Sequence, residues 1–217
     1  MTIKNIFFDF DGVLAESVSA KTDAFRELYL PFGGDIAEKV VAHHKYHGGV
    51  SRYEKFRIYH STFLGKELTD EEVQVLAGQF SDLVLKKVIA SDEVPGAKQF
   101  LEKYYKKMSF WIITGTPTKE IAVIASDRSM DNYFLGLHGS PEKKKYWTEY
   151  LLNKNKLNRE ETLFLGDAVT DYEAAVHSKI HFALREDAEN KAYFQDFNGI
   201  RFTDFYELEA LIKPNLP

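Results

Sequence analysis

The chain has 217 residues, of which 44% are hydrophobic, and a formal net charge of −5. A chain of this length buries a substantial core as one large domain or two small ones. The negative charge argues against a nucleic-acid partner, and the absence of cysteine excludes disulfides and zinc–cysteine sites. The sequence shows no signal-peptide pattern and no apolar run of membrane-spanning length, so we expect a cytoplasmic protein with no membrane partner.

The first predicted strand, residues 3–8, leads directly into Asp9 and Asp11, which flank Phe10. Side chains alternate faces along a strand, so the two carboxylates are expected to project the same way while Phe10 packs inward. Two neighbouring carboxylates repel each other unless a proton or a cation lies between them. The pattern therefore indicates a divalent-metal or acid–base site, with two turn-forming aspartates as the alternative.

A second apolar strand, residues 162–165, brings Asp167 and Asp171 to its end. These residues are candidates for the same carboxylate site. The alternative is structural: Asp167 would cap a helix that begins near residue 168, and Asp171 would be favoured in its first turn by the helix dipole.

A third strand, residues 109–113, ends in Thr114 and Gly115, which offer a hydroxyl and an unobstructed backbone amide to an anion. Thr116 is expected to cap the following helix, with Pro117 at the first helical position. Further along, a lysine run at residues 143–145 enters a predicted helix over 146–152. On its own such a run is typical of a solvated helix face.

Together, these four segments resemble the haloacid dehalogenase superfamily of phosphohydrolases, in the subgroup of phosphoglycolate phosphatases and β-phosphoglucomutases. The resemblance rests on Asp-Phe-Asp-Gly-Val-Leu at 9–14, a strand-terminal threonine at 114, a lysine within 143–145 and Gly-Asp-x-x-x-Asp at 166–171. The order and spacing of these motifs span essentially the whole chain.

The resemblance implies a role for each aspartate. Asp9 is the implied nucleophile, which forms an aspartyl-phosphate. Asp11 is the implied general acid and then the base that activates water. Mg²⁺ is implied as cofactor, held by the Asp9 carboxylate, the Asp11 backbone carbonyl, Asp167, the substrate phosphate and waters. Asp171 is expected to orient this set from its edge or to reach the metal through water.

The transferring phosphoryl group also needs positive surroundings, because its charge spreads over the equatorial oxygens. Thr114, the Gly115 amide and one lysine are implied to supply them. The family form Gly-x-Pro-x-x-Lys places that lysine at Lys144, with Lys143 and Lys145 as alternatives.

The predicted fold class is α/β, a Rossmann-like parallel sheet with an inserted helical cap domain. Strand and helix patterns alternate after residue 95 and end with strands near 181–184 and 199–202, as a parallel sheet with crossover helices requires. Residues 15–90 are instead helical in period. We therefore expect a core of residues 1–14 and 91–217 and a helical cap of residues 15–90.

Substrate specificity is expected to reside in this cap. The stretch Gly-Val-Ser-Arg at 49–52 resembles the cap loop of β-phosphoglucomutase-like proteins, in which the arginine grips a sugar phosphate. Arg52, Lys55 and Lys21 are therefore candidate substrate-binding residues, with an exposed loop arginine as the alternative. Lys21 departs from the mutase pattern, which has histidine ten residues after the second aspartate.

The sequence thus predicts a Mg²⁺-dependent phosphatase that acts on a small phosphorylated metabolite, most plausibly a sugar phosphate, as a monomer or small homo-oligomer. The alternatives are a phosphomutase and a non-catalytic binding module. A zinc site at His43, His44 and His47 is disfavoured, because the pattern lacks the glutamate of a zinc protease helix.

Overall fold

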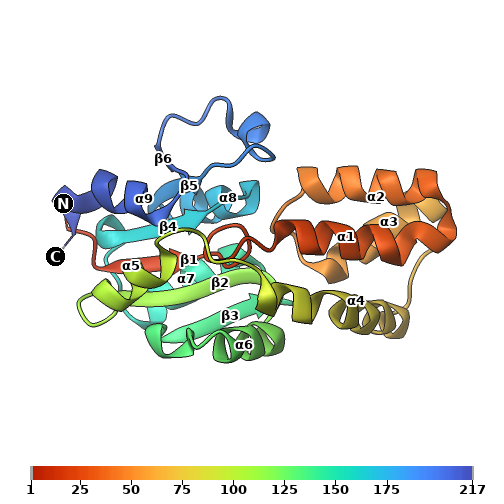
Figure 1. The fold of residues 1–217 in the computed structure, drawn as a ribbon, viewed down its shortest axis with the longest axis horizontal. Helices are drawn as coiled ribbons and strands as arrows, with labels where there is room; N and C mark the ends of the chain where they lie inside the picture. Colours follow the sequence, from red (N-terminus) through yellow and green to blue (C-terminus); the bar gives the residue numbers. More distant parts are fainter. Residues whose placement is uncertain (1, 217) are drawn as a thin grey trace.

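The core of the protein is one six-stranded parallel sheet with the strand order β3-β2-β1-β4-β5-β6 (Figure 1). The computed structural model describes residues 2–216. The strands are β1 (Asn5–Phe8), β2 (Ser109–Pro117), β3 (Gly136–Ser140), β4 (Thr162–Gly166), β5 (His181–Arg185) and β6 (Ile200–Phe202). The predicted α/β class is confirmed.

Helices connect the strands and cover both faces of the sheet. They are α5 (Ala97–Tyr104), α6 (Thr118–Asp127), α7 (Lys144–Lys154), α8 (Val169–His177) and α9 (Phe205–Ile212). The chain passes from β1 to β2 and β3 on one side, and then returns to place β4 on the other side of β1. In open parallel sheets, ligands bind where the strand order reverses, at the carboxyl ends of the strands.

The side chains of β1 show why this strand reads as continuously apolar. Ile6 and Phe8 pack into one buried cluster, and Phe7 packs into a second cluster on the opposite face. Phe7 meets Trp111 of β2 edge-on, with ring centroids 5.6 Å apart. Both faces of a central parallel strand are covered by helices, so Ile6, Phe7 and Phe8 are apolar on both faces.

Four further helices form an insertion between β1 and α5. They are α1 (Val18–Tyr29), α2 (Gly34–Tyr46), α3 (Arg52–Leu64) and α4 (Asp70–Ala90), and we refer to them as the helical insertion. Figure 1 shows them side by side beyond one end of the sheet. Phe25, Phe56 and Phe80 pack against one another inside it. The predicted helical character of residues 15–90 is therefore confirmed, and the division into two domains stays a prediction.

Short 3₁₀ helices complete the chain at Leu30–Phe32, Asp131–Tyr133, Arg159–Glu161, Lys191–Phe194 and Lys213–Asn215. Within residues 2–216, none of the helices combines the length and the apolar character that crossing a membrane requires.

Candidate active site

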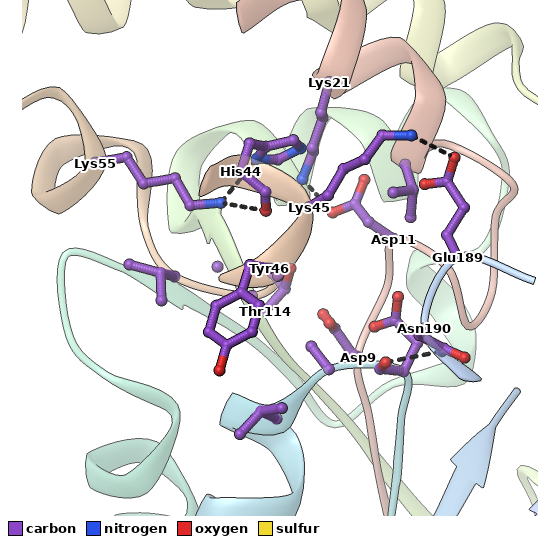
Figure 2. Close-up of a pocket in the computed structure, with 18 of the residues that line it drawn as sticks. Asp9, Asp11, Lys21, His44, Lys45, Tyr46, Lys55, Thr114, Glu189 and Asn190 are labelled. Carbon is purple, nitrogen blue, oxygen red and sulfur yellow. Dashed lines mark hydrogen bonds and ion pairs between the residues drawn. The ribbon is translucent and has the colours of Figure 1, made fainter. Parts of the chain in front are cut away.

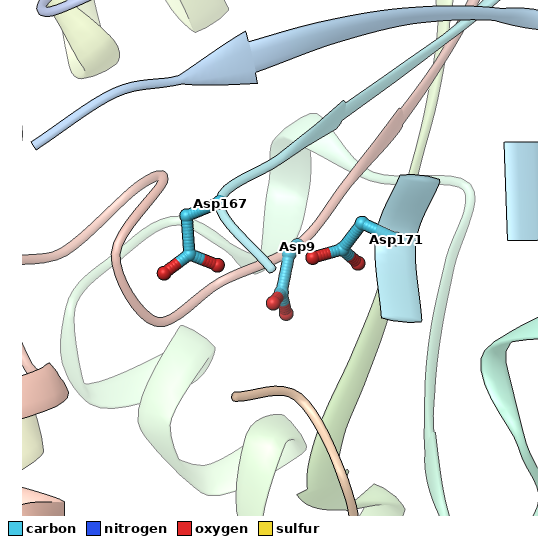
Figure 3. A group of neighbouring side chains, drawn as sticks. All are labelled: Asp9, Asp167 and Asp171. Carbon is cyan, nitrogen blue, oxygen red and sulfur yellow. The ribbon is translucent and has the colours of Figure 1, made fainter. Parts of the chain in front are cut away.

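Three of the predicted aspartates meet at the carboxyl edge of the sheet (Figure 3). Asp9 follows β1, Asp167 follows β4, and Asp171 lies in the first turn of α8. Each offers a carboxylate oxygen within 4.8 Å of those of the other two. Neighbouring parallel strands end at the same edge, which explains why residues more than 150 positions apart in sequence converge here.

Glycines in both motifs make this close approach sterically feasible. Gly12 has a φ of +77°, and a Cβ atom there would lie 2.3 Å from Asp167 Oδ2. A Cβ atom at Gly166 would lie 2.2 Å from Cβ of Asp171. Side chains at these positions would push the carboxylates apart, so the glycines are part of the site.

Lys144, at the start of α7, lies within this carboxylate cluster. Its Nζ atom donates to Asp9 Oδ2 at 2.6 Å and to Asp171 Oδ1 at 2.5 Å. Burial opposes its charge, but Asp171 and Asp9 outweigh burial and raise the pKa of Lys144. The side chains of Lys143 and Lys145 are exposed. Of the three adjacent lysines, the structure therefore brings only Lys144 to the aspartates.

The cluster still carries more negative than positive charge. Burial, followed by the Asp9 and Asp171 carboxylates, raises the pKa of Asp167 well above its ordinary value. Burial also raises the pKa of Asp171 to about 7, although Lys144 opposes this shift. Carboxylates that repel each other in a buried place are stabilised by a divalent cation, and Mg²⁺ accepts a small set of carboxylate ligands. The residues present therefore fit a divalent metal.

Asp11 has a separate environment. It is buried, and its Oδ1 accepts a hydrogen bond from Ser17 Oγ at 2.6 Å, while its Oδ2 accepts one from Thr116 Oγ1 at 2.9 Å. Lys21 of α1 forms an ion pair with the same Oδ2. Burial alone would raise the pKa of Asp11, but Lys21 and the two hydroxyls together lower it. Asp11 is thus held as a carboxylate that contacts both the sheet and the helical insertion.

Thr116 was predicted to cap a helix, and this prediction was wrong. Strand β2 continues through Pro117, which pairs with Ser140 of β3, and α6 begins at Thr118 with Pro117 as the N-cap residue. The Thr116 side chain is therefore free to bond Asp11. Strand alternation contains the signal that was missed, since Thr114 and Thr116 lie two residues apart and share a face.

A loop of the helical insertion covers Thr114 and Gly115. A Cβ atom at Gly115 would lie 2.6 Å from the Gly49 carbonyl oxygen, and the Gly48 carbonyl accepts a hydrogen bond from Thr170 Oγ1 at 3.3 Å. The loop therefore sits directly against the predicted anion cradle, and a side chain at position 115 would keep it away.

Arg52, at the start of α3, is buried, and its guanidinium is already paired. It makes a two-point ion pair with Glu120 of α6, at 2.9 Å and 2.7 Å, and a hydrogen bond to Ser81 Oγ at 2.7 Å. The guanidinium also stacks over Phe80, 4.6 Å from the ring centroid. Arg52 therefore lies at the edge of the site, and both of its terminal nitrogens donate to other side chains of the protein.

These side chains surround a cavity of about 90 Å³ between the sheet and the helical insertion (Figure 2). The sheet contributes Asp9, Asp11 and Thr114, and the insertion contributes Lys21 and Lys55. A second cavity of about 670 Å³ shares Gly49, Thr114 and Gly115 with it and is also lined by Lys144.

The histidines of α2 do not join the aspartates. His43 and His47 stack on each other with ring centroids 4.2 Å apart, and His44 turns toward Lys55. Within residues 2–216, the aspartate triad is the one group of three or more acidic or histidine side chains at metal-binding spacing.

The sequence is similar to known hydrolases. A family model for haloacid dehalogenase-like hydrolases matches residues 3–178. The sequence is 30% identical over 180 residues to a phosphoglycolate phosphatase from Photorhabdus laumondii, a match that covers 80% of this chain and 76% of that protein.

Solved structures share the fold across nearly the full chain. One, from Haemophilus somnus, is described as a predicted phosphoglycolate phosphatase; it has a TM-score of 0.73 and 21% identity and covers 97% of this chain and 98% of its own. Another, from Bacillus subtilis, is bound to magnesium and reveals interdomain movement; it has a TM-score of 0.70 and 15% identity and covers 98% of this chain and 100% of its own.

Proposed function

The chain belongs to the haloacid dehalogenase-like hydrolase family and is a phosphatase of that family. We propose that it hydrolyses a small phosphate monoester through a phosphoenzyme on Asp9, with Mg²⁺ as cofactor. The observation that supports this most strongly is the position of Asp9. Its carboxylate lies beside Lys144, in the aspartate triad and on the wall of the cavity.

In the first step, an oxygen of Asp9 attacks phosphorus, and the bond between phosphorus and the ester oxygen breaks. Asp11 acts here in its protonated form: it takes up a proton, against the contacts that lower its pKa, and donates it to that oxygen, so the leaving group departs as a neutral alcohol. General acid help of this kind contributes about 10²–10⁴ in rate. In the second step, Asp11 takes a proton from water and the water oxygen attacks phosphorus. The bond between phosphorus and the Asp9 oxygen breaks, so inorganic phosphate leaves and the Asp9 carboxylate is restored.

Positive charge has to accompany this chemistry, because a carboxylate and a phosphate dianion repel each other. Lys144 supplies one charge directly beside Asp9. We assign Thr114 and the Gly115 amide to the phosphoryl oxygens. Asp9, Asp167 and Asp171, with the Asp11 backbone carbonyl, would hold Mg²⁺, which neutralises charge on the transferring group when bound.

The contacts of Arg52 and Lys21 bear on the leaving group. A sugar phosphate was predicted because Gly-Val-Ser-Arg at 49–52 resembles a cap loop whose arginine grips a sugar phosphate, but here the Arg52 guanidinium is paired with Glu120. At position 21 the mutase pattern has histidine, whereas this chain has Lys21, which contacts Asp11 and Thr116. The pairing of Arg52 and the presence of Lys21 both favour ester hydrolysis over phosphate transfer between sugar positions.

A panel of phosphate esters, assayed for released phosphate with and without Mg²⁺, tests this function. The parent protein is expected to release phosphate from small esters with Mg²⁺ only, and Asp9→Asn is expected to release none while keeping its fold by circular dichroism. A matched variant at the exposed Lys143, Lys143→Gln, controls for the loss of a charge near the site. Faster interconversion of sugar phosphates than phosphate release would instead favour a mutase.

A further inference from the structure

Two tyrosines, one from the helical insertion and one from the core, leave much of their ring surface open to both cavities. Tyr46 ends α2, and Tyr193 lies in the 3₁₀ helix Lys191–Phe194 that follows β5. Tyr46 is 61% exposed and Tyr193 is 37% exposed. The phenylalanines that line the smaller cavity, Phe25, Phe80 and Phe194, are at most 4% exposed. A ligand can therefore reach the two tyrosine rings.

The two tyrosine rings form a corner. Their centroids are 5.3 Å apart and their planes are inclined at 79°, and we call Tyr46 and Tyr193 the aromatic corner. Aromatic rings prefer to pack either in an offset stack or edge to face. A flat ligand ring that lies parallel to one of these tyrosines is nearly perpendicular to the other, so it can make both favoured contacts at once. A puckered aliphatic ring has no π face with which to do so.

An ion pair joins the same two segments of the chain. Lys45 Nζ lies 2.9 Å from Glu189 Oε1, so the residue before Tyr46 is connected to the loop that carries Tyr193 (Figure 2). The two halves of the aromatic corner are thus brought together by a charged contact as well as by the rings. The exposed parts of the rings remain open to a ligand.

The aromatic corner shares a cavity with the groups that we assign to the phosphoryl site. The cavity of about 670 Å³ is lined by Tyr46 and Tyr193, and also by Thr114, Gly115 and Lys144. Its volume is within the roughly 300–1,000 Å³ typical of sites for drug-sized ligands. An ester held by its phosphoryl group at Lys144 therefore has room for a leaving portion that extends to the aromatic corner.

We propose that the aromatic corner binds a flat, unsaturated ring on the leaving portion of the substrate, so that the substrate is the phosphate monoester of an alcohol that carries such a ring. This inference rests on the proposed phosphatase function and adds a second recognition element to it. Two kinds of ester have this chemistry. In a nucleoside 5′-monophosphate a sugar separates the base from the phosphate, and in an arylmethyl phosphate a single carbon separates the ring from it.

Two pairs of esters that differ in the ring test the proposal and distinguish these two sources. Benzyl phosphate and cyclohexylmethyl phosphate have equal numbers of carbons, but only benzyl phosphate has a flat ring. AMP and ribose 5-phosphate are both esters of a primary sugar alcohol, but only AMP carries a base. The measured quantity for each pair is the ratio of kcat/KM for the ring-bearing ester to kcat/KM for its partner. This ratio does not depend on the fraction of correctly folded enzyme.

The parent is expected to prefer the ring-bearing ester in at least one pair, and that pair identifies the source of the ring. Tyr46→Ala and Tyr193→Ala should each lower that ratio about 5- to 100-fold, the loss expected when a ring loses a stacking partner. Tyr46→Phe and Tyr193→Phe should keep the ratio, because they keep the aromatic ring. Tyr206→Ala removes an exposed tyrosine of α9 and should leave the ratio unchanged.

A ratio that stays unchanged in Tyr46→Ala or in Tyr193→Ala would overturn the proposal, as would a parent enzyme with no preference in either pair. Losses in the phenylalanine variants as large as those in the alanine variants would also overturn it, because the hydroxyl and not the ring would then recognise the substrate. In each of these cases hydrolysis of ribose 5-phosphate or cyclohexylmethyl phosphate would leave the phosphatase function standing. A parent enzyme that hydrolyses none of these esters, nor any other in the panel, would overturn both.

Discussion

Arg52 and Glu120 join the helical insertion to helix α6 of the core through a two-point ion pair, with Nη1 2.9 Å from Oε1 and Nη2 2.7 Å from Oε2. The guanidinium side chain is 4% exposed and the carboxylate side chain 18%. α3 and α6 are therefore tied together beside the cavity. A planar guanidinium suits this bidentate geometry, and lysine would not reproduce it.

We expect Arg52→Ala and Glu120→Ala to destabilise the protein by similar amounts, because each leaves the other charge without its partner. The double variant should be less destabilised than the sum of the single variants, with a coupling energy of about 1–3 kcal/mol. Urea unfolding of the four proteins measures this. Additive losses would mean that the pair contributes no mutual stabilisation, and that Arg52 is free to serve a ligand.

Replacing Lys55 should make the protein more stable, with a dependence on pH. Burial, followed by Lys21 and Lys144, lowers the pKa of Lys55. The unfolded chain then binds a proton that the folded chain releases, so this residue costs stability below the unfolded pKa of about 10.4, and the cost vanishes above it. Lys55→Met should therefore raise the free energy of unfolding near pH 7, and the gain should shrink toward about pH 10.

Unfolding in urea at several pH values measures this gain, with the exposed Lys39→Met as the control. A gain that stays constant with pH would show that the folded protein keeps Lys55 protonated. A loss of stability at every pH would show that Lys55 contributes packing or hydrogen bonds that outweigh its burial.

Removal of divalent metal should abolish turnover and lower the melting temperature. The repulsion within the aspartate triad is relieved by a cation, and a ligand that binds only the folded state at 100 times its Kd stabilises it by about 2.7 kcal/mol. Mg²⁺ should restore both properties, and Ca²⁺ should restore activity poorly because it prefers more and longer ligand bonds.

Calorimetric scans with EDTA, with Mg²⁺ and with Ca²⁺ provide the measurement, alongside phosphate release. Asp167→Asn serves as the matched variant and should lose the Mg²⁺-dependent rise in melting temperature. Full activity in excess EDTA would contradict the metal assignment.

Asp11→Asn should slow hydrolysis of alkyl phosphates by about 10²–10⁴. The loss in forming the phosphoenzyme should be smaller with p-nitrophenyl phosphate, because nitrophenolate leaves without a proton. Stopped-flow detection of the nitrophenolate burst, compared with steady-state release from ethyl phosphate, separates the two steps. Equal losses in both would indicate that Asp11 acts by positioning rather than by proton transfer.

The sequence predicted those site residues that lie close to the carboxyl end of an apolar strand or at the start of a helix. Asp9 and Asp167 each follow a recognisable apolar strand, Thr114 follows the apolar stretch 110–113 within β2, and a parallel sheet brings the carboxyl ends of its strands together. Lys144 was identified by its spacing within a motif at the start of a helix. Each of these positions needed only the pattern of its own segment.

The contacts that the sequence did not reveal depend on how separate helices pack. Glu120 lies 68 residues from Arg52, and the residue pattern of neither helix predicts that the two side chains form an ion pair. His44 and Lys55 come from consecutive helices whose crossing is fixed by the apolar packing around Phe25. Side-chain partners of this kind follow from tertiary packing, which a one-dimensional pattern does not specify.

The account depends most on a phosphoryl group carried by Asp9, and chemical trapping tests this directly. Borohydride reduces an acyl phosphate to an alcohol, so quenching the enzyme during turnover should convert Asp9 to homoserine, detectable by mass spectrometry of the peptide that contains it. We predict homoserine at position 9 in the parent and none in Asp9→Asn, which should also be inactive. An unmodified Asp9 in a protein that is turning over, together with an active Asp9→Asn variant, would contradict the account.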